Sequence, residues 1–319
     1  MTTLLLSHDI CIEHQTPEGH PERPDRLRAL NQILASEHFD DLAREDAPIA
    51  PREQVLLAHP EDYVSMIEGL SPESGMEAID ADTWMSPASL EAALRGVGAA
   101  TRAVDALANR EVDNVFCATR PPGHHAETNR AMGFCLFNNV AVAAHYAREE
   151  YDLERVAVID FDVHHGNGTQ EIFWSDPDLF YGSTHQMPLF PGSGSRSETG
   201  EGNIFNAPLS NGDGGEIFRE AMTTTVLPAL DAFEPDMLII SAGFDAHRSD
   251  PLGGLQLTEE DFAWVTLRLM ELADRHADGR VVSVLEGGYD LAGLASSAGI
   301  HIQALMKGTG ETKGMTPDD

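Results

Sequence analysis

Apolar and polar positions follow two patterns along the chain, one typical of buried strands and the other of amphipathic helices. Six short, almost uninterrupted apolar runs predict strands buried on both faces of a sheet, at residues 2–7, 114–119, 155–160, 179–184, 237–242 and 281–286. Longer segments repeat apolar residues every three or four positions and predict helices, at residues 21–37, 86–109, 138–150, 216–233, 258–276 and 290–306. Strands that alternate with helices predict an α/β fold, with a mostly parallel sheet between two layers of helices.

No linker divides the chain of 319 residues. We therefore expect a single three-layer α/β/α domain over 1–307 and a flexible tail over 308–319, where low-complexity sequence follows the last helix. The first residues, MTTLLLSHD, reach charged side chains before any apolar stretch adequate for a signal peptide. No segment approaches the roughly 20 apolar residues of a membrane helix, so we expect a cytoplasmic protein without a membrane partner.

The chain is strongly acidic, with 53 acidic against 20 basic residues and a formal net charge of −33. A field of this sign repels phosphates, so we expect no nucleic-acid partner. The charge could attract cationic substrates, but we favour the interpretation of a solvating surface like that of proteins adapted to salt. The three cysteines, Cys11, Cys117 and Cys135, form no CxxC pair, which argues against a disulfide framework and against a thiolate zinc site.

Titratable residues gather directly after four of the predicted strands, in RPPGHHAE (120–127), DFDVHHGNG (160–168), SAGFDAHRSDP (241–251) and LEGGYD (285–290). In open parallel sheets, ligands bind beyond the carboxyl ends of the strands. Asp162 and His164 alternate along a strand end and therefore point the same way, and Asp245 follows a different strand. Two carboxylates and one imidazole suit a divalent metal with open positions, which is typical of a catalytic zinc.

Each of these residues has an ordinary alternative when taken alone. Asp245 could cap a helix, His124 and His125 could be loop histidines, and Tyr289 could be a half-buried aromatic residue. Their combination at four strand ends favours a functional site. Four other histidines have no such spacing and are expected to be structural: His145, His185, His247 and His301.

At these motifs, together with GFCLFNN (133–139), the chain resembles the zinc-dependent histone deacetylases of the arginase/deacetylase fold, in particular class II and the bacterial histone deacetylase-like amidohydrolases. The resemblance runs from residue 20 to Tyr289 and implies a deacetylase domain that hydrolyses an acylated amine, typically acetyl-lysine. It implies one zinc ion per chain, bound by Asp162, His164 and Asp245. It also implies that His124 and His125 form the general acid/base pair and that Tyr289 polarises the substrate carbonyl.

The chemistry is consistent with these roles. Two anionic ligands leave the zinc site formally neutral, so its water is acidified less than with three histidines and needs a base, for which His125 is well placed. Asp160 is expected to fix the tautomer of His124. Asn167 is the expected partner of His125, at a position where many class I relatives carry aspartate. The resemblance further implies a structural potassium ion, held near Asp160, Asp162, His164 and Ser183.

Expectations for the substrate channel are less constrained by the sequence. Its walls are expected to be Gly133, Phe134 and Phe190, although both phenylalanines could be core residues. Acetylpolyamine deacetylases carry an acid where this chain has Leu252, but Glu22 and Asp82 could supply acids at the rim, and Asp82 could bind a substrate backbone amide. The arginine beneath the active site in the family corresponds to Arg26, with Arg23 as the alternative.

Three other functions are weighed against acyl-lysine hydrolysis. An arginase-like dinuclear enzyme needs further carboxylates at positions near Gly166 and His247, and neither of these residues is an acid. A non-catalytic acyl-binding protein would be expected to lack a metal ligand, one of the two histidines or the tyrosine, and none of these is missing here. Acetylpolyamine hydrolysis on the same site stays open, as do the acyl chain and the formation of a homo-oligomer.

Overall fold

A computed structural model describes residues 1–309 of the chain. Its main sheet has eight strands in the order β2-β1-β5-β10-β9-β6-β7-β8, and every neighbouring pair is parallel. The strands are β1 (Thr3–Ser7), β2 (Ala43–Asp46), β5 (Asn114–Ala118), β6 (Val156–Asp160), β7 (Leu179–Gln186), β8 (Ile204–Leu209), β9 (Met237–Ala242) and β10 (Val281–Leu285). A separate pair, β3 (Glu77–Ala78) and β4 (Trp84–Met85), is antiparallel.

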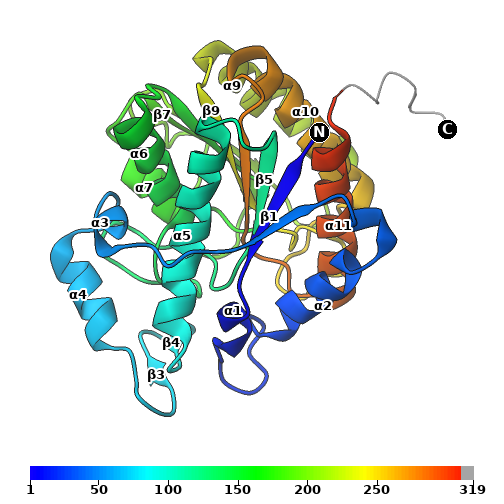
Figure 1. Ribbon diagram of the computed structural model, residues 1–319. Coiled ribbons are helices and arrows are strands. Elements are labelled where there is room, and N and C mark those ends of the chain that lie inside the picture. The colour runs from blue at the N-terminus through cyan, green and yellow to red at the C-terminus, as the bar shows by residue number, and fades with distance from the viewer. Residues whose placement is uncertain (310–319) are drawn as a thin grey trace.

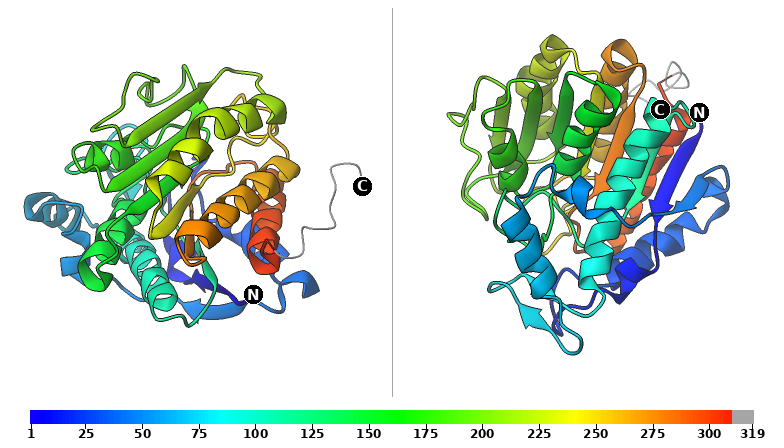
Figure 2. Two further views of the ribbon diagram at one scale, coloured as in Figure 1. Left: turned by 90° about the horizontal axis from the view of Figure 1, so that it is seen from above. Right: turned by 60° about the vertical axis from the view of Figure 1, so that its left-hand side comes forward.

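Helices cover both faces of the sheet, as Figures 1 and 2 show. One apolar core packs one face against α2 (Asp25–Leu34), α8 (Gly215–Ala221), α9 (Leu227–Phe233), α10 (Glu259–His276) and α11 (Leu291–Lys307). The other core packs the opposite face against α3 (Arg52–Val55), α4 (Glu61–Gly69), α5 (Ser89–Ala108), α6 (Asn139–Tyr151) and α7 (Asn167–Phe173). Within β1, Leu5 belongs to the first core and Leu4 and Leu6 to the second, as the alternation of side chains along a strand requires. The remaining elements are α1 (Ile10–Glu13), η1 (Glu37–Phe39) and η2 (Met222–Val226).

The predicted α/β/α class is confirmed, and all six predicted strands are present within two residues of their expected bounds. The two strands of the main sheet without a prediction, β2 and β8, are its edges, and the short pair β3 and β4 has no prediction either. β2 reads ARED and is half exposed, and β8 contains Pro208, so neither has the apolar run that identifies a central strand.

Two predicted helices differ in detail. The helix expected from residue 21 begins only at Asp25, because Pro21 and Pro24 precede it and proline is compatible only with a helix start. The helix expected over 216–233 contains the π-helical segment η2 between α8 and α9. The predicted tail over 308–319 lies outside the described residues, except for Gly308 and Thr309. Within residues 1–309, no helix is both long enough and apolar enough to cross a membrane.

Candidate metal centre and active site

The four polar clusters follow four strands that are neighbours in the sheet, β5, β10, β9 and β6. Because all eight strands are parallel, their carboxyl ends share one edge, which lies at the lower end of Figure 1, where β1 runs into α1 and the β3–β4 pair projects. The sheet therefore brings together side chains that are far apart in the sequence.

Asp162, His164 and Asp245 form the candidate metal centre. All three are buried, and one potential ligand atom from each lies within 4.8 Å of the others. Among residues 1–309, this is the only group of three or more such side chains. The backbone N–H of Gly287 donates to Asp162 Oδ2 (2.8 Å) and that of Val163 to Asp245 Oδ1 (2.8 Å), which holds both carboxylates in place. Two carboxylates and one imidazole form a donor set that fits a catalytic zinc.

The charges of this group favour a cation at its centre. Burial opposes protonation of His164, but hydrogen bonds to Asp162 and Asp245 outweigh it and raise the pKa of His164 to about 10. Burial and the charge of Asp162 raise the pKa of Asp245 to about 7. Buried carboxylates in this arrangement need a positive partner, and a divalent metal supplies it in place of the protons.

The two adjacent histidines have opposite electrostatic surroundings. His124 Nδ1–H donates to Asp160 Oδ2 (2.9 Å). Burial opposes the charge on His124, but Asp160 and Asp162 outweigh it and raise its pKa well above the usual value. Burial, followed by the charges of His124 and His164, lowers the pKa of His125 well below its usual value. The rings are 4.0 Å apart between centroids, and the opposite pKa shifts favour a charged imidazole beside a neutral one, an arrangement suited to acid/base chemistry.

Asn167 bonds to the neutral histidine: its Oδ1 accepts from His125 Nδ1–H (2.9 Å), which leaves His125 Nε2 free to take a proton. The amide is oriented by Glu127, whose Oε1 accepts from Asn167 Nδ2 (2.8 Å). A second carboxylate, Glu286, accepts the backbone N–H groups of Gly123 (2.7 Å) and His124 (3.2 Å). No role is predicted from the sequence for Glu127 or Glu286. Both lie within the motifs after β5 and β10, and their acidity at a strand end is the only sequence signal for them.

Tyr289 is buried within reach of the charges of Asp245 and Asp162 in the candidate metal centre, and Arg26 lies against its ring, with the guanidinium carbon 4.8 Å from the ring centroid. Burial raises the pKa of Tyr289 well above its usual value, so its hydroxyl keeps its proton and can donate it. Arg23, the alternative in the sequence, has a side chain 44% exposed and pairs with Asp25. The structure therefore places Arg26 beneath the site.

Phe134 and Phe190 both flank the site. The ring of Phe134 meets that of Tyr289 edge to face at 5.8 Å, and the ring of Phe190 meets that of His125 at 5.1 Å. Phe190 is 41% exposed, which excludes a core position for it. Phe134 has a φ of +71°, a backbone conformation that costs a non-glycine residue about 1 kcal/mol and is concentrated at functional sites. Gly133 (φ +57°) precedes it, and a Cβ there would overlap the His125 ring.

The expected rim residues are only partly in place. Asp82 is half-buried between β3 and β4; its Oδ1 accepts from the Thr83 hydroxyl (3.1 Å), and the Thr83 oxygen accepts the N–H of Phe134 (3.2 Å). Leu252 is half-buried in the loop after β9. The prediction that Glu22 could act as a rim acid is wrong, because Glu22 is fully buried and bonded to Arg26 and Arg120.

Two further expectations concern metals. Ser183, a predicted potassium ligand, is paired with Asp160 across β6 and β7, and its hydroxyl shares a hydrogen bond with His185 Nδ1 (2.8 Å). The potassium site stays a prediction. A second metal of the arginase kind would need a carboxylate at Gly166, but any Cβ there would overlap Asp160 and Tyr181.

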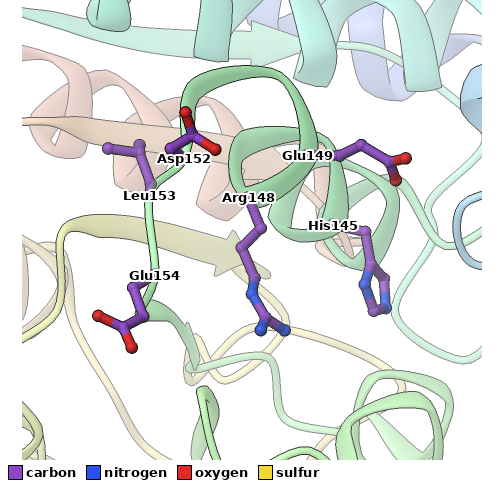
Figure 3. Close-up of a pocket in the computed structure, with 6 residues that line it drawn as sticks. All are labelled: His145, Arg148, Glu149, Asp152, Leu153 and Glu154. Atoms are coloured by element: carbon purple, nitrogen blue, oxygen red, sulfur yellow. The ribbon is translucent and has the colours of Figure 1, made fainter.

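A hollow of about 570 Å³ lies elsewhere on the molecule, lined by His145, Arg148, Glu149, Asp152, Leu153 and Glu154 (Figure 3). It lies where α6 leads into β6 and therefore at the amino end of that strand, opposite the edge that carries the metal centre. The guanidinium of Arg148, which lines the hollow, is already paired, with Nη1 2.5 Å from Asp176 Oδ2. The hollow contains none of the four strand-end motifs.

Comparison with known proteins gives the same result as the geometry. A family model described as "Histone deacetylase domain" matches residues 20–305. The chain is 38% identical over 315 residues to a "Probable deacetylase" of Archaeoglobus fulgidus, covering 97% of this chain and 87% of that protein. It is 41% identical over 287 residues to a "Histone deacetylase-like amidohydrolase" of Pseudomonas aeruginosa, covering 88% and 75%. The crystal structure of the HDA15 HD domain superimposes with a TM-score of 0.91 at 35% identity, covering 96% of this chain and 88% of that one. This chain belongs to the histone deacetylase family.

Proposed function

We propose that this chain is a zinc-dependent amidohydrolase that removes an acetyl or other acyl group from an acylated amine, and that acetyl-lysine in a peptide or protein is its main substrate. The observation that carries the proposal is the placement of two adjacent histidines, one bonded to a carboxylate and the other to a neutral amide, beside the buried group of Asp162, His164 and Asp245.

When held by those three residues, zinc supplies Lewis-acid polarisation of the substrate carbonyl and an acidified water. His125 takes the proton of the attacking water at Nε2, because its Nδ1–H is engaged by Asn167. The hydroxyl of Tyr289 donates to the carbonyl oxygen as negative charge develops there. His124, held as an imidazolium by Asp160, supplies charge stabilisation and a proton for the departing amine.

The channel walls favour an extended aliphatic chain. Phe134 and Phe190 flank the site from two different loops, and aromatic faces can bind methylene groups while excluding water from the reacting carbonyl. A lysine side chain has this form.

Acetylpolyamine hydrolysis is the second candidate, and Asp82 is the observation that favours it. Its half-buried carboxylate lies next to Thr83, which contacts the backbone of Phe134. A distal ammonium group could pair with an acid in this position. Glu22 offers no such support because it is buried, and Leu252 is apolar at the position where such enzymes carry an acid.

One experiment tests both candidates. Acetylated lysine peptides, acetylpolyamines and longer acyl-lysines are compared by kcat/KM at equal zinc loading, with release of the free acid as the readout. The proposal expects the acetyl-lysine peptide to be preferred and expects His125→Ala to abolish turnover while zinc is retained. Preference for the acetylpolyamine would replace the substrate assignment, and activity of His125→Ala would remove the base from the mechanism.

A further inference from the structure

The segment from Glu286 to Asp290, which carries Tyr289, is held from below by Arg26. The guanidinium donates from Nε to the carbonyl oxygen of Gly288 (2.6 Å) and from Nη2 to that of Glu286. Gly288 has a φ of +121°, a conformation that is open to glycine and strained for other residues. These contacts fix two carbonyl groups of the segment, and the N–H of Gly287 donates to Asp162, which leaves the N–H groups of Tyr289 and Asp290 to another partner.

That partner is Asp250, a residue of the loop after β9. Its Oδ2 accepts the backbone N–H groups of Tyr289 (2.7 Å) and Asp290 (3.1 Å), and its Oδ1 accepts that of Leu252 (3.0 Å). Asp250 is 7% exposed, so water competes little for these bonds. One buried carboxylate thus joins the segment of the candidate catalytic tyrosine to the turn that carries a candidate rim residue.

We propose that Asp250 is a positioning residue that holds the Tyr289 hydroxyl over the reacting carbonyl and couples its placement to the Leu252 turn. This inference rests on the proposed function, in which Tyr289 donates to the developing oxyanion. Asp250 does not touch the substrate in this account. It acts through two backbone N–H groups and the side chain that they carry.

The chemistry of the carboxylate explains why an amide cannot replace it. Aspartate has two acceptor oxygens, and both are used here, whereas asparagine has one acceptor oxygen and one donor nitrogen. In Asp250→Asn, the donor nitrogen therefore faces either the Leu252 N–H or the N–H groups of Tyr289 and Asp290. Two donors facing each other repel, so the backbone segment that meets the new NH2 group must move. A displacement of about 1 Å at a reacting group can cost about 100-fold in rate.

A matched control separates positioning from general stabilisation. Asp261 is also a buried carboxylate that accepts a backbone N–H, that of Thr258 (2.9 Å), but it caps α10 and pairs with Arg219. Asp261→Asn removes a similar buried acceptor without touching the tyrosine segment. Both variants should lower thermal stability, whereas only Asp250→Asn should lower kcat.

The test is a double-mutant cycle on the full chain at equal zinc content, with an acetyl-lysine peptide as substrate. Asp250→Asn should lower kcat about tenfold or more in the wild-type background, and less than about twofold in the Tyr289→Phe background, where no hydroxyl is left to position. It should also change the ratio of kcat/KM between an acetylpolyamine and the peptide, because the Leu252 turn moves.

Equal losses in both backgrounds, or an equal loss of kcat in Asp261→Asn, would overturn the positioning role while leaving the proposed function intact. Full activity of Tyr289→Phe would instead remove the tyrosine from the mechanism and the inference with it. If circular dichroism shows Asp250→Asn to be unfolded, Asp250→Ser, whose hydroxyl can accept one N–H, takes its place in the cycle and must meet the same criteria.

Discussion

The partner of His125 offers a quantitative test of the acid/base assignment. Replacing Asn167 by aspartate would put a charge where the neutral amide oxygen now lies, 2.9 Å from His125 Nδ1. A carboxylate there lies about 4 Å from the centre of an imidazolium charge, and at an effective dielectric constant of about 20 their attraction is about 4 kcal/mol. This corresponds to an upward shift of about three units in the pKa of His125.

Glu127 reduces this shift in the single variant. Its Oε1 now accepts from Asn167 Nδ2 at 2.8 Å, so in Asn167→Asp two carboxylates would face each other and share a proton. Little net charge is then added beside His125, and we expect a shift of less than about one unit. Adding Glu127→Gln removes the repulsion and allows most of the shift, whereas Glu127→Gln alone keeps an acceptor for the Asn167 amide and should change little.

The measurement is the dependence of kcat/KM on pH with an acetyl-lysine peptide, because its acid limb reports the pKa of the essential base in the free enzyme. His125 must be neutral to act, so a higher pKa moves the loss of activity to a higher pH. The order of the acid limbs should be wild type, then Asn167→Asp, then the double variant. A double variant whose acid limb coincides with that of the wild type would refute the assignment of His125 as the base.

Four further predictions follow from the same geometry. Tyr289→Phe should lower kcat by roughly 100- to 1000-fold, as loss of one oxyanion donor does, with unchanged zinc content; a fully active variant would exclude the hydroxyl. Metal analysis should find one divalent metal per chain, and Asp162→Asn should weaken its binding, whereas two equivalents required for activity would favour a dinuclear enzyme. Leu252→Glu should raise kcat/KM for acetylpolyamines relative to acetyl-lysine, since the new acid can pair with a distal ammonium; an unchanged ratio places Leu252 away from the substrate. His301 is buried and neutral, with its pKa lowered to about 3 by burial, below an unfolded value of about 6.5. Its contribution to stability is therefore complete above pH 6.5 and is lost as the pH falls, by about 2 kcal/mol at pH 5; denaturant unfolding of the wild type and His301→Asn should differ in this pH dependence.

The central strands and the candidate metal ligands could be predicted from the sequence better than the edge strands and the rim residues. Central strands such as 237–242 are buried on both faces and so have uninterrupted apolar runs, whereas the edge strand β2 is half exposed and the edge strand β8 is interrupted by Asn206 and Pro208, so neither has such a run. Asp162, His164 and Asp245 could be predicted because the carboxyl ends of parallel strands must meet at one edge.

Residues that act through backbone N–H groups could not be predicted in this way. Asp250 and Glu286 bind amide hydrogens of segments distant in sequence, and the sequence does not record which N–H groups a fold leaves unpaired. The prediction of Glu22 as a rim acid is wrong for a similar reason, because contacts between distant segments cannot be read from the sequence. The burial of Glu22 depends on Arg120, which is separated from it by nearly 100 residues.

The place of β10 in the sheet determines when the site can form during synthesis. β10 is the last strand within residues 1–309, yet it pairs with β5 on one side and with β9 on the other. Until residues 281–285 have left the ribosome, no strand joins β1, β2 and β5 to β6, β7, β8 and β9, and the sheet does not yet connect the His124–His125 pair to the candidate metal ligands. A nascent chain that stops before β10 should therefore contain two incomplete half-sheets with exposed edges. Insertion of the one central strand β10 should join the two half-sheets and complete the site.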